Sequence, residues 1–240
     1  MQIRTFLKKL MVFGNQNLYR EKILQYENYN VDYGMGNIRS VAQALLKVAP
    51  DARVVIANTP AQIRAADRII LPGQGAMPDC MAQLASSGLL EEVLCASKNK
   101  PLLGVCVGEQ MLFENSAEAH APHLVTPCLG LFPGSVVRFN LHQQELPNGQ
   151  YLKVPHMGWN TVESLGETPL LAGVEGQHFY FVHGYAVKSS ECSTATTEYG
   201  GRFVSVASRD NFFATQFHPE KSQHAGLQLL KNFIHWDGNS

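Results

Sequence analysis

The chain has 240 residues, of which 45% are hydrophobic and 16% are charged, and its formal net charge is −1. This composition is typical of a globular protein and excludes disorder as the default state. The balanced charge offers no basic surplus for a phosphate backbone, and no apolar run reaches the ~18 residues of a transmembrane helix. We therefore expect a globular protein that binds neither nucleic acid nor a membrane.

The first half of the chain alternates short apolar segments with helical patterns. Strands are predicted over residues 53–57, 68–71 and 101–105, and helices over residues 37–48, 60–66 and 77–97. Strands that alternate with helices predict a parallel sheet covered by helices on both faces. The start is unusual, because residues 26–31 read YENYNV where a first parallel strand should be apolar. Either this strand is short and atypical, or an arm over residues 1–27 precedes a domain over residues 28–240.

The second half of the chain is richer in strand patterns. Strands are predicted over residues 134–139, 151–163, 178–188, 194–199 and 202–217, and a last amphipathic helix over residues 222–236. Gly, Pro and Asn turns join these strands, which favours antiparallel additions to the sheet. The sequence therefore predicts one α/β domain with a mixed, mostly parallel central sheet flanked by helices.

The five cysteines include no CxxC pair. Their odd number argues against a disulfide framework or a structural zinc site and fits a reducing cytoplasm. Cys106 stands apart, because Gly104–Gly108 reads GVCVG after an apolar strand and before the helical pattern EQMLFENSAE over residues 109–118. This is the layout of a nucleophile elbow with a thiol in place of the hydroxyl.

The elbow context decides how Cys106 is interpreted. Glycines let neighbouring backbones approach the turn, and the start of a helix favours the thiolate. A free cysteine is more often a small buried hydrophobe, and that interpretation stands for the other four: Cys80, Cys95, Cys128 and Cys192. For Cys106 the flanking glycines indicate a nucleophile instead.

A candidate base lies in residues 216–222, which read QFHPEKS. Pro219 favours an extended conformation at His218, and residues i and i+2 of an extended segment share a face. Glu220 can therefore hold one ring nitrogen of His218 while the other faces the thiol. A further segment, residues 71–77 (LPGQGAM), follows a strand and could aim backbone N–H groups at an oxyanion.

Together these three motifs, in this order and spacing, resemble those of class I glutamine amidotransferases. Three more segments resemble the glutaminase subunits of imidazole glycerol phosphate synthases: VDYGMGNIRSV at 31–41, VPHMGWN at 154–160 and YFVHGY at 180–185. The resemblance covers about residues 31–236, which is nearly the whole chain.

The resemblance implies that Cys106 attacks the side-chain amide of glutamine, that His218 takes the thiol proton and later activates water, and that Glu220 orients His218. Further positions match the family's oxyanion hole (Gln74, after a peptide rotation, and Val107) and its glutamine site (Gly75 and Gln110). No cofactor or metal is implied.

The resemblance also implies a partner. Ammonia would pass to a cyclase subunit, a (βα)₈ barrel, which would make imidazole glycerol phosphate for histidine synthesis and an aminoimidazole carboxamide ribotide. The positions that match the cyclase interface are Met157, Gly158, Trp159, Asn160, Tyr180 and Lys221.

Two residues depart from the family's pattern. Glu109 occupies a site that is apolar in many relatives, and a carboxylate there would raise the pKa of the thiol unless it points to solvent or to a cation. Gln74 stands where many relatives carry Val, which changes the conformational preference of the oxyanion segment.

Three alternative functions need to be distinguished from this one. A paralogous amidotransferase could feed ammonia to another synthase, and neighbouring genes would identify it. A non-catalytic subunit predicts a broken triad, whereas this one is complete. A stand-alone cysteine peptidase or amidase would act on peptides without a partner and would leave PHMGWN unexplained.

Overall fold

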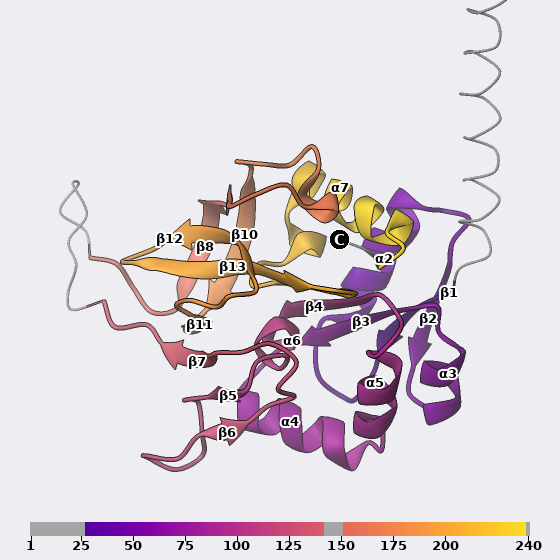
Figure 1. Cartoon of the computed structure of the whole chain (residues 1–240), viewed down its shortest axis with the longest axis horizontal. Helices are drawn as coiled ribbons and strands as arrows, with labels where there is room; N and C mark the ends of the chain where they lie inside the picture. The colour runs from indigo at the N-terminus through magenta and orange to yellow at the C-terminus, as the bar shows by residue number, and fades with distance from the viewer. Residues whose placement is uncertain (1–26, 142–150, 239–240) are drawn as a thin grey trace, which may run out of the picture.

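A computed structural model describes residues 27–141 and 151–238 of the chain. At its centre lies an eight-stranded mixed sheet in the order β2-β1-β3-β4-β14-β13-β12-β9 (Figure 1). Strands β2 to β14 in this order pair in parallel, and β14 to β9 pair antiparallel. The bounds are β1 (Glu27–Val31), β2 (Arg53–Ala57), β3 (Arg68–Gly73), β4 (Leu102–Cys106), β9 (Glu163–Ser164), β12 (Ser193–Glu198), β13 (Arg202–Arg209) and β14 (Phe212–Thr215).

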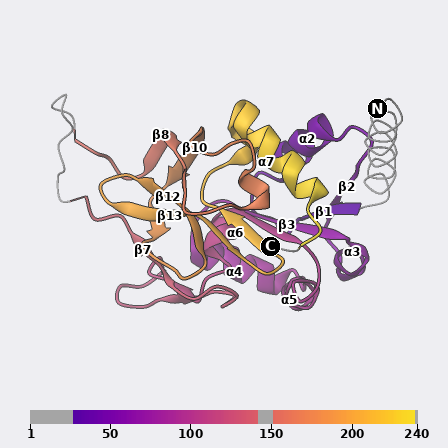
Figure 2. The ribbon, with the colours of Figure 1, turned by 45° about the horizontal axis from the view of Figure 1, so that its top comes forward.

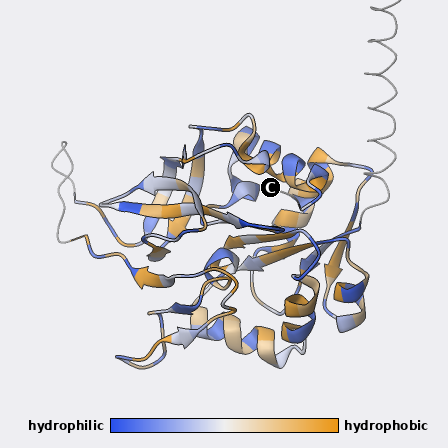
Figure 3. Cartoon of the chain, viewed as in Figure 1, coloured by the Kyte–Doolittle hydropathy of each residue, from blue (hydrophilic) through white to orange (hydrophobic). Residues whose placement is uncertain are grey.

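Helices cover both faces of the parallel part of this sheet. On one face α2 and α7 lie side by side, and on the other lie α3, α4 and α5 (Figures 1 and 2). Every residue of β3 and β4 is buried, and the central strands are strongly hydrophobic (Figure 3). The predicted α/β class and mixed sheet are thus confirmed. The helices are α2 (Ile38–Val48), α3 (Pro60–Ala65), α4 (Met77–Ser86), α5 (Leu90–Ala96) and α7 (Gln223–His235).

Two smaller sheets flank the antiparallel end of the main sheet. One is the antiparallel pair of β8 (His156–Thr161) and β10 (His178–His183), which lies beside β12. The other has the order β11-β7-β5-β6. Its strands are β5 (Asn115–Ser116), β6 (Thr126–Pro127), β7 (Ser135–Arg138) and β11 (Tyr185–Val187). Three short helices complete the described elements: α6 (Val107–Gln110), η1 (Pro169–Leu171) and η2 (Pro219–Lys221).

Several predicted elements were too long. The single helix over 77–97 is wrong, because Gly88 adopts a φ of +75° and separates α4 from α5. Of the helical pattern over residues 109–118, only Glu109 and Gln110 are helical, at the end of the four-residue α6, and Leu112 and Phe113 enter the core instead.

Three predicted strands are also shorter or divided. The strand over 178–188 breaks at Gly184 into β10 and β11, which belong to different sheets. A turn at Asp210, whose φ is +54°, divides the strand over 202–217 into β13 and β14. The strand over 151–163 is regular only within β8.

The unusual first strand does form. Residues Glu27–Val31 pair in parallel with both β2 and β3, and Tyr29 and Val31 enter the core. The side chains of Asn28 and Asn30 are also fully buried, which is why the strand does not look apolar in the sequence. The proposed arm over residues 1–27 lies outside the described residues except for Glu27 and stays a prediction.

Candidate active site

The elbow places Cys106 at the carboxyl end of β4, in a backbone conformation that side chains rarely adopt. Its φ is +57°, and only 4% of the residue is exposed. The glycines around it are sterically required. A Cβ at Gly108 would lie 1.9 Å from the carbonyl oxygen of Leu71, and one at Gly73 would lie 2.4 Å from the backbone nitrogen of Gly108. The turn can therefore press against the end of β3 only because these side chains are absent.

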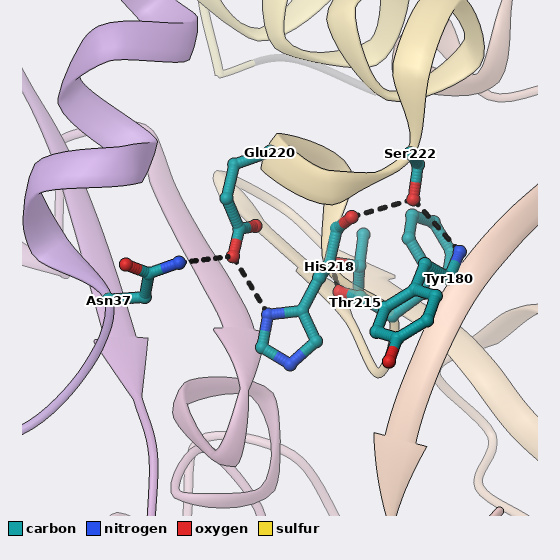
Figure 4. A network of polar contacts seen from close by, with 7 residues as sticks. Asn37, Tyr180, Thr215, His218, Glu220 and Ser222 are labelled. Carbon is teal, nitrogen blue, oxygen red and sulfur yellow. Dashed lines mark hydrogen bonds and ion pairs between the residues drawn. The ribbon is translucent and has the colours of Figure 1, made fainter. Parts of the chain in front are cut away.

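His218 and Glu220 form the pair that the sequence predicts. His218 is extended, with φ −99° and ψ 96°, and its Nδ1 lies 2.9 Å from Oε1 of Glu220 (Figure 4). The Glu220 side chain is fully buried, and its Oε1 also accepts a hydrogen bond of 3.3 Å from Nδ2 of Asn37. With Nδ1 held by the carboxylate, Nε2 is the ring nitrogen of His218 that is left for chemistry.

The Cys106 thiol and the His218 ring line one cavity of about 280 Å³. Burial acts to lower the pKa of His218, but hydrogen bonding to Cys106 and Glu220, with the charges of both, outweighs it and raises the pKa to about 10. The imidazolium is therefore favoured when a thiolate stands on one side and a carboxylate on the other.

The backbone of His218 is fixed to strand β10. Its N–H donates to the carbonyl of Tyr180 at 2.9 Å. The Ser222 hydroxyl donates to the carbonyl of His218 at 2.6 Å and accepts from the N–H of Tyr180 at 2.9 Å (Figure 4). Both backbone groups of Tyr180 thus hold the candidate base, one of them through Ser222.

The predicted oxyanion and glutamine residues share this cavity. Its lining includes Gln74, Gly75, Val107 and Gln110. Gly75 has a φ of +100°, which only glycine adopts readily. The structure therefore brings all four of these residues to the cavity that Cys106 lines.

Sequence reasoning missed Glu118, His183 and Tyr185, which also line the cavity. Glu118 accepts a hydrogen bond of 2.8 Å from the N–H of Met77 and is half-buried. No motif singles out Glu118. His183 and Tyr185 stand within YFVHGY, a segment that carries the family resemblance but of which only Tyr180 was predicted to have a role.

Glu109 points neither to solvent nor to a cation in the part of the chain that the structure describes. It is 1% exposed, and its Oε1 has no hydrogen-bond partner among the described residues. Burial, with a smaller contribution from the charge of Cys106, raises the pKa of Glu109 well above its usual range. Burial therefore disfavours a negative charge on Glu109 beside the thiol.

The predicted interface residues cluster on β8 and its neighbours. Met157 and Trp159 are 63% and 46% exposed, and the Trp159 ring lies edge-on to that of Tyr180 with centroids 6.1 Å apart. Gly158 lies between them on β8, and Lys221 is exposed at the cavity. Asn160 is different, because its amide turns inward to His156 and to the carbonyl of Glu198.

The described ranges 27–141 and 151–238 contain neither a metal-binding cluster nor a membrane-spanning helix. No group of three or more His, Cys, Asp or Glu side chains there is arranged to hold a metal ion. No helix in those ranges is both long and apolar enough to cross a bilayer.

The chain matches known proteins along most of its length. A family model described as glutamine amidotransferase class-I matches residues 29–236. The chain is 51% identical over 208 residues to the imidazole glycerol phosphate synthase subunit HisH of Dechloromonas aromatica, covering 86% of this chain and 94% of that relative. It is 50% identical over 209 residues to the subunit of the same name from Aromatoleum aromaticum, covering 86% and 96%.

Solved structures support the same fold. A GMP synthase-like protein from Thermoplasma acidophilum matches with a TM-score of 0.60 at 20% identity, covering 87% of this chain and 92% of that one. A glutamine amidotransferase structure matches with a TM-score of 0.61 at 18% identity, covering 86% and 98%. The chain therefore belongs to the class-I glutamine amidotransferase family. Within that family it groups with the imidazole glycerol phosphate synthase subunits HisH.

Proposed function

We propose that the chain hydrolyses glutamine to glutamate and supplies the ammonia to the cyclase subunit of imidazole glycerol phosphate synthase, in histidine biosynthesis. The observation that carries this proposal is the thiol, imidazole and carboxylate set around one cavity. It occurs in a chain about half identical to HisH proteins over most of its length. The paralogous alternative, ammonia delivery to a different synthase, finds less support, because these relatives share one name.

The first half-reaction forms a thioester. The Cys106 thiolate attacks the carboxamide carbon of glutamine, and the carbonyl π electrons move to oxygen. Backbone N–H groups of Val107 and, after a peptide rotation, Gln74 would hold this oxyanion. The His218 imidazolium then gives its proton to the leaving nitrogen, so that ammonia departs and a γ-glutamyl thioester remains.

The second half-reaction releases glutamate. Neutral His218 takes a proton from water while the hydroxide attacks the thioester carbon, and the thiolate of Cys106 leaves. Glu220 keeps Nδ1 of His218 protonated throughout, so that Nε2 handles both proton transfers. A thiolate at this position needs reducing conditions, and we therefore place the reaction in the cytoplasm.

The cavity offers groups for the rest of the substrate. Gly75 and Gln110 lie at its wall, and Glu118 adds a carboxylate that suits the α-ammonium of glutamine. A cavity of about 280 Å³ suits an amino acid of this size.

We further propose that the cyclase, a (βα)₈ barrel, binds on the face formed by Met157, Gly158, Trp159, Tyr180 and Lys221. Exposed aromatic and Met side chains are typical anchors of protein interfaces. The ammonia path would run from the cavity between the two subunits, where exclusion of water keeps ammonia unprotonated.

The test compares glutamate release by the chain alone and with the cyclase and the cyclase's nucleotide ligand. We expect low activity alone and a large rise in the complex. Cys106→Ala should abolish glutamine-dependent synthesis and spare ammonia-dependent synthesis, whereas loss of both in an intact complex would contradict the proposal. Trp159→Ala should weaken cyclase binding about tenfold in a titration, and unchanged affinity would exclude Trp159 from the interface.

A further inference from the structure

Two buried histidines face each other between the cavity and the proposed cyclase face. His156 of β8 and His183 of β10 are directly opposite in the strand register, and Nδ1 of His156 lies 3.0 Å from Nε2 of His183. Both residues are buried, and His183 lines the cavity. They belong to VPHMGWN and YFVHGY, and the proposed reaction assigns neither of them a role.

The direction of the hydrogen bonds is determined by backbone carbonyls. The carbonyl of Tyr185 can only accept, so the Nδ1 that lies 2.8 Å from it on His183 carries the proton. Burial lowers the pKa of His183 to about 3, so this ring is neutral and its Nε2 is an acceptor. His156 must therefore donate from Nδ1.

The hydrogen bond between His156 and Asn160 is assigned in the same way. Burial lowers the pKa of His156 to about 4, so its Nε2 is an acceptor as well. Asn160 donates to it from Nδ2 at 3.3 Å, and the same Nδ2 donates to the carbonyl of Glu198 at 3.0 Å. The hydrogen bonds thus run in one direction, from Asn160 through His156 and His183 to Tyr185.

The chain of hydrogen bonds continues to the substrate site. The carbonyl of Tyr185 also accepts from Nε2 of Gln110 at 2.9 Å, and that nitrogen gives its second hydrogen to Oε1 of Gln216 at 2.8 Å. Both amide hydrogens of Gln110 are therefore used. The group left to face a ligand is the Gln110 side-chain oxygen, which can only accept a hydrogen bond.

We propose that His156 and His183 are positioning residues for glutamine: they hold the Tyr185 carbonyl, and through it the Gln110 amide, so that its oxygen meets an N–H of the substrate. This inference rests on the proposed glutaminase function. It also gives Asn160 a role that differs from that of Met157 and Trp159, because its amide begins the chain of hydrogen bonds rather than facing a partner.

The test uses the complex with the cyclase. His156→Phe retains an aromatic ring to stack on Tyr199 and Phe181, whose centroids lie 4.0 Å and 4.8 Å from that of His156, and removes the hydrogen bonds. We expect the KM for glutamine to rise about tenfold with kcat changed less than about twofold. His156→Asn, whose amide can donate from the place of Nδ1, should restore KM to within about threefold. His178→Phe, at the exposed end of β10, is the matched control and should leave KM unchanged.

An unchanged KM in a folded His156→Phe complex would overturn the inference. If that variant does not fold, the tautomers of His156 and His183 in the wild-type chain test the inference instead. Long-range ¹H–¹⁵N correlation spectra at neutral pH should show both rings protonated at Nδ1, and an Nε2–H tautomer at either ring would overturn the chain of hydrogen bonds. This spectrum does not depend on activity, so a wild-type complex that releases no glutamate would count against the proposed function alone.

Discussion

The elbow after β4 and the β8–β10 sheet line the same cavity but are built in different ways. At the elbow, backbone lies against backbone, and Gly73 and Gly108 are needed because no Cβ fits between β3 and the start of α6. In the β8–β10 sheet, side chains do the positioning: His156 and His183 sit among aromatic rings such as Phe139. This chain therefore fixes its nucleophile by steric exclusion and its proposed substrate contacts by directed hydrogen bonds.

The largest effect is expected at Glu220, because it holds His218. The His218 ring lines the cavity with Cys106, and its backbone is hydrogen-bonded to Tyr180 of β10. Glu220→Gln keeps an oxygen that can accept from Nδ1 of His218 but removes the charge that helps to raise the pKa of that ring. We expect kcat/KM for glutamine in the complex to fall roughly 10²–10⁴-fold, and the histidine ionisation in its pH profile to move to lower pH.

Two controls make this result specific. Ammonia-dependent synthesis by the same complex should be unaffected, because the cyclase does that chemistry. Glu163→Gln removes an exposed carboxylate that pairs with Arg202 on the surface, and it should leave kcat/KM as it is. A wild-type rate in Glu220→Gln would mean that His218 needs no carboxylate.

The steric side of the comparison is tested by Gly108→Ala. The added Cβ would meet the backbone oxygen of Leu71 at 1.9 Å, and a backbone group cannot swing aside as a flexible side chain can. We expect a loss of about 3 kcal/mol or more in the free energy of unfolding, measured by urea denaturation. Gly166→Ala is the matched control, because a Cβ there meets nothing within 4 Å. Equal stability of the two variants would show that the elbow relaxes easily.

Features like those of the elbow can be predicted from the sequence more easily than features like those of the β8–β10 sheet. Apolar runs and glycines are visible in a sequence, so the strand over 53–57, the elbow at Cys106 and the His218–Glu220 pair were predicted correctly. The break at Gly88 was missed, because a single glycine within a helical pattern is compatible with either a helix or a turn.

Side-chain networks leave weaker traces in a sequence. Nothing in the periodicity of residues 151–163 or 178–188 shows that His156 and His183 face each other, since that depends on the register between β8 and β10. Nor could burial of Asn28 in β1 be expected, because a polar residue usually indicates an exposed position. Polar residues that tertiary contacts bury are therefore the part of this site that needed a structure.

The two buried histidines of the β8–β10 sheet predict a loss of folding stability in acid. His156 and His183 have pKa values of about 4 and 3 when folded, below the ordinary 6.5 of an exposed histidine. As the pH falls below 6.5, these two histidines bind protons in the unfolded chain but not in the folded chain. The stability that they contribute above pH 6.5 is therefore lost toward pH 4. We expect a loss on the order of 2–3 kcal/mol between pH 6.5 and pH 5, before most carboxylates titrate.

In His156→Asn, which cannot titrate at this position, about half of that loss should disappear when urea midpoints are compared across the same pH range. If the variant and the wild type lose stability equally, the two rings do not stay neutral in the folded protein, and the directed chain from Asn160 to Tyr185 fails with them.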